Sequence, residues 1–214
     1  MICVSLAEES LSACLEALES LDFAEIRLDA MPSLTLADVD HLFSRPARLI
    51  ATNRPSGPFE DHERKAMLMA AIRSGATYVD IEAESEAAYR DEIVQEARTR
   101  GCKVIISFHD YEKTPEKQDL EAIVSSCFEA GADIAKVACT VHSDRDCARL
   151  LGLLDSPRQV VAIGMGEKGR VTRITAPLLG SPFTFASLSK GKETAQGQID
   201  KETLKHMWEV LSIR

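Results

Sequence analysis

Short apolar or alternating segments recur along the whole chain at a nearly regular interval. Their starts are separated by roughly 20–30 residues, about the length of one strand, one helix and two loops. Each segment is bounded by polar or glycine-containing stretches, which is typical of a β-strand. The predicted strands cover residues 2–6, 24–29, 47–53, 77–83, 103–109, 133–139, 159–165 and 183–188.

Amphipathic helix patterns fill most of the intervals between these strands. In 10–21, Leu11, Cys14 and Leu18 fall at helical spacing, and Glu16 faces the other side. The pattern over 116–130 is similar, and a glycine follows it as a helix stop. Further helices are predicted over 61–74, 84–99, 144–154 and 200–212.

This alternation predicts an α/β fold, the (β/α)8 TIM barrel, as a single domain over residues 1–214. The alternative is a doubly wound open sheet. The first predicted strand is followed by Ala-Glu-Glu-Ser rather than by a glycine fingerprint, so a dinucleotide-binding fold has no support. The barrel is therefore the better interpretation.

Composition narrows the function classes. A formal net charge of -9 argues against a nucleic-acid surface, which needs a basic stripe. The six cysteines include no C-x-x-C pair, which predicts a reduced, cytoplasmic protein. The N-terminus lacks a signal-peptide pattern. No apolar run reaches the ~18 residues of a membrane span, so no membrane partner is expected.

Charged residues alternate with apolar ones in two of the predicted strands. Glu25, Arg27 and Asp29 share one face of 24–29, and Asp80 and Glu82 share one face of 77–83. In half-exposed antiparallel strands such residues would simply face water. Helices between all the strands require an apolar outer face, so the charges should point inward. Buried charges are costly unless they are paired, which indicates a functional site.

Two residues are candidates for chemistry. Lys136 lies in an apolar strand, where a lysine is otherwise a snorkelling or edge residue. In a barrel interior near Arg27 and Arg173, desolvation and like charge would favour the neutral amine, the nucleophile that forms an imine with a ketone. His109 ends its strand at the mouth where barrel enzymes keep their chemistry, and it suits general acid/base work. The alternative interpretation is that His109 is a capping or core histidine.

Two polar loops follow the last two predicted strands. Residues 164–173 contain three glycines, whose backbone N–H groups would be able to approach an anion. Residues 191–198 are similarly polar, and together the loops form a plausible binding rim. The other histidines show no H-E-x-x-H or similar spacing, so no metal site is predicted.

At this point the motifs match a known family. The chain resembles type I 3-dehydroquinate dehydratases from the first strand to the last helix. The likeness lies in AEIRLDA, ATNRP, IISFHDYEKTP, DIAKVAC, and GMGEKGRVTR followed by TAQGQ. It implies a cofactor-independent lyase that converts 3-dehydroquinate, its small-molecule substrate, to 3-dehydroshikimate in the shikimate pathway of aromatic amino acid biosynthesis. The family often forms homodimers, and the helix patterns of this chain neither support nor exclude that state.

The resemblance assigns roles to individual residues. Lys136 forms the imine, His109 moves protons, and Arg173 pairs with the substrate carboxylate. The remaining assigned residues contact the substrate: Glu25, Arg27 and Arg54 bind hydroxyls and orient the ring, Ser5 and Gln198 fall at contact positions, and Thr194 stands where the family usually has serine.

One position departs from the family pattern. Pro58 occupies the place of a glutamate that supports the catalytic histidine, and Glu60 or Asp61 is the nearest replacement. Two other functions stay open at this stage. A class I aldolase would use the same lysine on a sugar phosphate, and a non-catalytic binding barrel would keep Lys136 only as a buried ion-pair partner.

Overall fold

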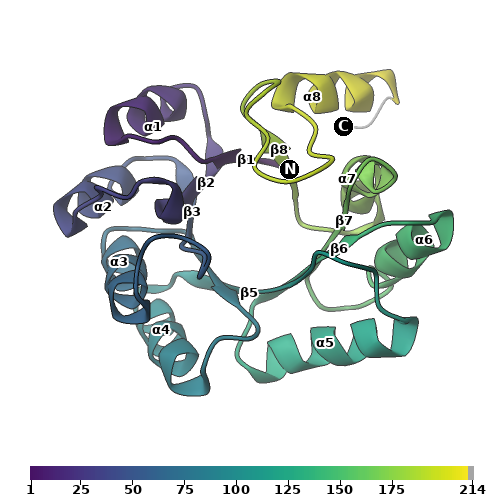
Figure 1. Ribbon diagram of the computed structural model, residues 1–214, viewed down its shortest axis with the longest axis horizontal. Coiled ribbons are helices and arrows are strands. Elements are labelled where there is room, and N and C mark those ends of the chain that lie inside the picture. Colours follow the sequence, from purple (N-terminus) through teal and green to yellow (C-terminus); the bar gives the residue numbers. More distant parts are fainter. Residues whose placement is uncertain (212–214) are drawn as a thin grey trace. The chain divides into compact units, whose positions relative to one another are not determined.

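The structure is a computed structural model that describes residues 1–211. Strands and helices alternate along the described chain (Figure 1). The eight predicted strands are confirmed, with bounds that differ from the prediction by at most two residues. The strands are β1 (Ile2–Leu6), β2 (Phe23–Arg27), β3 (Arg48–Thr52), β4 (Tyr78–Glu82), β5 (Lys103–Asp110), β6 (Ile134–Thr140), β7 (Val160–Met165) and β8 (Thr184–Ser187).

The six predicted helices are also confirmed, although position 212 of the last one lies outside the described residues. They are α1 (Leu11–Leu18), α3 (Asp61–Arg73), α4 (Ala87–Arg100), α5 (Lys117–Glu129), α6 (Asp144–Gly152) and α8 (Lys201–Val210). Their apolar positions are buried, for example Cys14 and Leu18 in α1. Among residues 1–211, no helix combines the length and the apolar character needed to cross a bilayer.

Two helices have no counterpart in the prediction. Helix α2 (Leu36–Phe43) begins with a reciprocal capping box between Thr35 and Asp38, a local signal that the sequence does contain. Helix α7 (Arg170–Thr175) falls in the segment interpreted above as a glycine-rich loop, and the 3-10 turn η2 (Ala176–Leu179) follows it. Six residues are too few to show a helical period, so the glycines of 164–173 led to the prediction of a loop there.

The chain divides into two compact units, one of which spans Ser5–Ile105. In this unit the strands pair with their neighbours along the chain, from the end of β1 through β2, β3 and β4 to the start of β5. Strands β2 and β3 are parallel, with Glu25 opposite Ile50. Helices α3 and α4 lie side by side (Figure 1), joined by ion pairs of Lys65 with Glu92 and of Arg73 with Glu96, each at 2.8 Å.

The other unit comprises Met1–Val4 and Ile106–Arg214. Here β6 lies between the rest of β5 and β7, and the start of β1 pairs with β8. Strands β6 and β7 are parallel, with Lys136 opposite Val161. Helix α8 covers β8 through a cluster that includes Ala186 and Leu204. Alternate residues of β8 therefore face away from α8.

The first turn of helix α6 contains a buried carboxylate. The side chain of Asp146 accepts hydrogen bonds from the backbone N–H groups of His142 and Ser143 at 2.8 and 2.9 Å, and from Arg149 at 2.7 Å. Burial acts to raise the pKa of Asp146, but the backbone hydrogen bonds and Arg149 outweigh it and lower the pKa below its usual range. The protonation of Asp146 is therefore coupled to the stability of the fold at acid pH.

Because the folded pKa is the lower one, Asp146 stabilises the fold above the unfolded value of about 4, and this contribution is lost as the pH falls through the folded pKa. We expect Asp146→Asn to flatten the acid limb of the unfolding free energy, measured by urea denaturation between pH 3 and 6. Asp144→Asn, which changes an exposed carboxylate in the same turn, is the control. Equal acid limbs in the two variants would contradict this role.

Candidate active site

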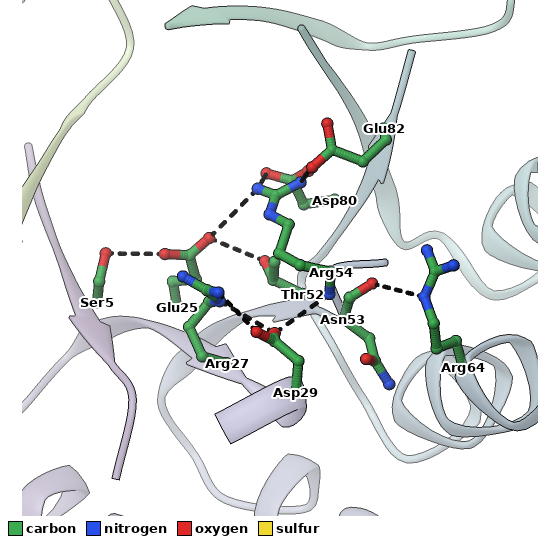
Figure 2. Close-up of polar contacts among 10 residues, drawn as sticks. All are labelled: Ser5, Glu25, Arg27, Asp29, Thr52, Asn53, Arg54, Arg64, Asp80 and Glu82. Atoms are coloured by element: carbon green, nitrogen blue, oxygen red, sulfur yellow. Dashed lines mark hydrogen bonds and ion pairs between the residues drawn. The ribbon is translucent and has the colours of Figure 1, made fainter. Parts of the chain in front are cut away.

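A buried arginine fork organises the polar residues of the Ser5–Ile105 unit. Arg54 follows β3, and its guanidinium reaches two carboxylates of β4 (Figure 2). Nη1 donates to Asp80 at 2.9 Å and to Glu82 at 2.5 Å, while Nη2 donates to the second oxygen of Asp80 at 3.1 Å. The two carboxylates alternate with Ile81 along the strand and so share one face, as the sequence predicted.

The environment of Arg54 keeps it charged. Burial alone would lower the pKa of Arg54, but Asp80, Glu82 and Glu25 together raise it above its ordinary value. The side chain of Asp80 is fully buried. Removing one partner of such a buried pair leaves an uncompensated charge, which is strongly destabilising. Arg54 is thus fixed in charge and in position.

Two hydroxyl groups hold Glu25 on β2. Ser5 donates to one carboxylate oxygen at 2.8 Å, and Thr52 donates to the other at 2.9 Å. A further oxygen-to-nitrogen distance of 4.0 Å joins Glu25 to Arg54 (Figure 2). The three strands β1, β2 and β3 therefore contribute one polar side chain each to the same cluster. Charge-assisted hydrogen bonds of this kind are short and strong, so they hold the carboxylate in a fixed orientation.

Asp29 corrects one detail of the prediction. Strand β2 ends at Arg27, so Asp29 does not continue the strand face but lies in the 3-10 turn η1 (Leu28–Ala30). Its carboxylate accepts from Arg27 at 2.6 and 3.0 Å and from the backbone N–H of Arg54 at 3.2 Å. A Cβ added to Gly57 would lie 2.6 Å from that of Asp29, so only glycine allows this approach. The turn therefore positions the side chain of Arg27 and the backbone of Arg54.

The loop after Arg54 contains the departure from the family pattern. Pro58 is exposed, and helix α3 begins three residues later. Glu60 forms the capping box of α3 with Glu63, and Asp61 pairs with Arg64 at 2.6 Å. Both carboxylates that were considered as replacements therefore have roles at the start of α3.

Lys136 lies in the second unit, on the all-buried part of β6, and is 5% exposed. Its Nζ atom is 4.2 Å from the centre of the Phe185 ring on β8. Lysine is almost never buried to this extent unless it is paired or functional. The prediction that this lysine is not a surface residue is confirmed by its burial.

His109 lies near the end of β5 and is partly exposed. Its ring stacks on that of Tyr111, with centres 5.9 Å apart and planes inclined by 10°. The segment after it is anchored locally: Asp110 accepts from the N–H groups of Glu112 and Lys113, each at 2.9 Å. The carbonyl oxygen of Tyr111 accepts from Thr140 at 2.8 Å. The histidine is thus held at a structured strand end.

Arg173 lies in α7 and is 1% exposed. Within the described residues its guanidinium donates hydrogen bonds to two carbonyl oxygens, those of Phe185 and Gln196, each at the long distance of 3.4 Å. Its Nε atom has no hydrogen-bond partner in the described part of the chain. Burial, assisted by the like charge of Arg170, lowers the pKa of Arg173 to about 10. This cation is suited to receive an anion.

The loops after β7 and β8 are joined at glycines. The N–H of Gly166 donates to the carbonyl oxygen of Gln196 at 3.1 Å. Gly197 has a φ angle of 74°, and a Cβ there would overlap the Gly166 carbonyl group. Gln198 accepts from the backbone N–H of Thr194 at 2.7 Å and from its hydroxyl group at 3.3 Å. The two loops therefore form one backbone framework beside Arg173.

The predicted site residues fall into two groups. Ser5, Glu25, Arg27 and Arg54 lie in one unit, where hydrogen bonds join them. The other group, in the second unit, comprises His109, Lys136, Arg173, Thr194 and Gln198. The prediction did not assign Asp80, Glu82 and Thr52 to the site, although the alternation in Tyr-Val-Asp-Ile-Glu had marked the first two. In residues 1–211 no group of three or more His, Cys, Asp or Glu side chains is arranged to hold a metal ion.

Comparison with known proteins agrees with the sequence motifs. A 3-dehydroquinate dehydratase of Methanocaldococcus jannaschii is 35% identical over all of both chains. A 3-dehydroquinate dehydratase structure from Geobacillus kaustophilus matches with a TM-score of 0.85 and 26% identity, covering 99% of this chain and 90% of its own. A type I enzyme structure from Clostridium difficile matches with a TM-score of 0.87 and 23% identity, covering 98% and 91%.

These structures confirm the predicted (β/α)8 fold class. The family model for type I 3-dehydroquinase matches residues 2–214. The match leaves out a single residue of the chain, and the motifs that carry it lie in both units. The chain belongs to the type I 3-dehydroquinase family.

Proposed function

We propose that this protein is a hydro-lyase that dehydrates 3-dehydroquinate to 3-dehydroshikimate, a step of the shikimate pathway in aromatic amino acid biosynthesis. The observation that carries the proposal is family membership over residues 2–214. The test is to incubate the purified protein with 3-dehydroquinate and to follow, by mass spectrometry, the appearance of a product that is lighter by one water. Unchanged substrate in the presence of folded protein would refute the activity.

Lys136 is proposed as the covalent catalyst. Its neutral amine attacks the C3 ketone, and water leaves to give a protonated imine. The imine draws electrons from the ring and acidifies the hydrogen on C2. Its place in the interior of an apolar strand supports this role, because an amine there is partly removed from water.

His109 is proposed as the general acid/base. It removes the C2 proton, and the C–H electron pair forms the C2–C3 double bond of an enamine while the imine π pair moves to nitrogen. The same residue then protonates the C1 hydroxyl group as it leaves. This regenerates the protonated imine, whose hydrolysis releases product and neutral Lys136. Partial exposure at a strand end supports a group that must reach the substrate.

The remaining residues are proposed to bind the substrate. Arg173 pairs with its carboxylate, for which a bidentate guanidinium has the matching geometry. By the family resemblance, Glu25, Arg27 and Arg54 bind the hydroxyl groups, and Ser5, Thr194 and Gln198 complete the contacts. The long hydrogen bonds of Arg173 support its role, since an anion would satisfy a guanidinium whose hydrogen bonds within residues 1–211 go to two carbonyl groups.

The two buried arginines should respond differently to substitution by methionine. Arg54→Met leaves Asp80 and Glu82 without their cation and should lower the free energy of unfolding by about 3–5 kcal/mol. Arg173→Met removes a buried charge that lacks a carboxylate partner in residues 1–211, so stability should be unchanged or higher. The free energy of activation derived from kcat/KM should nevertheless rise by about 2–5 kcal/mol, mainly because KM increases.

Urea denaturation and steady-state kinetics on both variants provide the measurements. The exposed Arg170→Met, one turn away in the same helix, is the control for a general loss of positive charge. An Arg173→Met protein with normal KM would remove this residue from carboxylate binding.

The aldolase alternative is separated by competition. Sugar phosphates should compete poorly with 3-dehydroquinate, whereas carboxylates that resemble quinate should compete well, because Arg173 presents a planar fork to the anion. Stronger inhibition by phosphate esters would favour the aldolase. A non-catalytic binding protein would bind the carboxylates without turnover.

We further propose a cytoplasmic homodimer that works without a metal or an organic cofactor. The six cysteines are buried thiols, which supports a reducing compartment. Sedimentation velocity tests the dimer, and activity after exhaustive dialysis against a chelator tests the independence from metal.

A further inference from the structure

One contact of Lys136 lies outside the roles proposed above. The Nζ atom is 4.2 Å from the ring centre of Phe185, close to the ring face. The two residues come from β6 and β8 of the same unit, and they are 5% and 3% exposed. Water is therefore largely excluded from around the contact, which strengthens any electrostatic interaction across it.

One neighbouring side chain packs directly against the Phe185 ring, and a second contact reaches the backbone of the same residue. Phe183 packs its ring against it with centres 5.5 Å apart and planes inclined by 74°. The backbone carbonyl of Phe185 accepts from Nη1 of Arg173 at 3.4 Å. Phe183 immediately precedes β8, and Phe185 lies on the face of β8 opposite to Ala186, which packs on α8. The ring is therefore packed against Phe183 while its face lies beside the amine.

The face of an aromatic ring carries negative charge density and attracts cations. Nζ is uncharged in the attacking amine and in the enamine, and it is positive in the protonated imine. The imine carries this charge twice, before C2 deprotonation and again after the C1 hydroxyl has left. Arg173 is a second cation close to Phe185, and its charge repels the positive charge of the imine.

We propose that Phe185 is a catalytic residue whose ring face binds the positively charged imine nitrogen on Lys136. This inference rests on the proposed function, because it requires the imine. The ring stabilises the cationic imine relative to its neutral forms.

The test measures how strongly the imine holds its proton. Borohydride reduces a protonated imine much faster than a neutral one, so the rate of trapping against pH reports the protonation of the imine. Phe185→Leu should lower the proton affinity of the imine about 2- to 30-fold. The alkaline limb of the profile, the pH above which the trapping rate declines, should therefore fall by about 0.3–1.5 units. Trapping is followed by intact mass and a peptide map of Lys136.

Pentafluorophenylalanine at position 185 separates the charge of the ring from its shape. It keeps the ring but reverses the charge distribution over its face, so the limb should move at least as far as in Phe185→Leu. Phe183→Leu is the comparison variant: it keeps the Phe185 ring but removes the ring that packs against it, so the limb should move less than in Phe185→Leu. If the trapping rate declines at the same pH in the natural and the fluorinated protein, the inference is overturned, although the imine itself is still supported. If the natural protein yields no adduct, the proposed mechanism and this inference both fall.

Discussion

Lys136→Ala should abolish turnover and the borohydride adduct together. The methyl side chain of alanine cannot attack the C3 ketone. Without the amine of Lys136 no imine forms, and the covalent route is lost. The loss in kcat should be on the order of 10⁵–10⁶-fold, the scale seen when a covalent nucleophile is removed. The measurement is turnover of 3-dehydroquinate, together with intact mass after borohydride treatment.

Binding gives the distinguishing control for this variant. The carboxylate contact through Arg173 does not need the amine, so substrate should still bind to Lys136→Ala, as measured by calorimetry. Lys117→Ala, which removes an exposed lysine paired with Glu121 at 3.6 Å, should keep both adduct and activity. An adduct that persists in Lys136→Ala would place the imine on another lysine.

His109→Ala should separate imine formation from elimination. The amine of Lys136 remains, so the adduct should still form with borohydride. Without a general acid/base, C2 deprotonation and loss of the C1 hydroxyl slow down, and kcat should fall about 10²–10⁴-fold. Single-turnover kinetics with mass detection should show the substrate imine accumulating rather than the product imine.

Hydrogen exchange at C2 provides a second measurement on the same variant. The natural protein should exchange this hydrogen with deuterated water through the enamine, and His109→Ala should not. Tyr111→Ala removes only the stacked neighbour and should retain much more exchange than His109→Ala. Turnover at the natural rate in His109→Ala would remove the histidine from the mechanism.

The strands could be predicted from the sequence because their signal is local. Alternation of polar and apolar residues positioned β4 within one residue and correctly put Asp80 and Glu82 on one face. Helix α7 was missed because six residues carry no period and three glycines precede it. The end of β2 was misjudged because Asp29 continues the alternation, although its hydrogen bonds to Arg27 belong to a turn.

The site was predicted less completely than the fold. Single residues such as Lys136 stand out, because a charge in an apolar strand is unusual wherever it occurs. Contacts between distant segments give no such signal. The fork of Arg54 on Asp80 spans 26 residues, and the contact of Lys136 with Phe185 joins β6 to β8. Nothing local in Phe-Thr-Phe-Ala distinguishes a core ring from one that faces the amine.

The crowded crossing of Gly197 and Gly166 restricts how this protein can be redesigned. Position 197 has room only for hydrogen beside the carbonyl group of Gly166. A loop transplanted from a relative at 191–198 therefore has to pass the unchanged loop at 164–169 at this point. Chimeras that exchange one loop alone should express poorly, and those that exchange both should be tolerated. Libraries aimed at new carboxylate substrates are therefore better built by diversifying the two segments jointly, with both glycines kept.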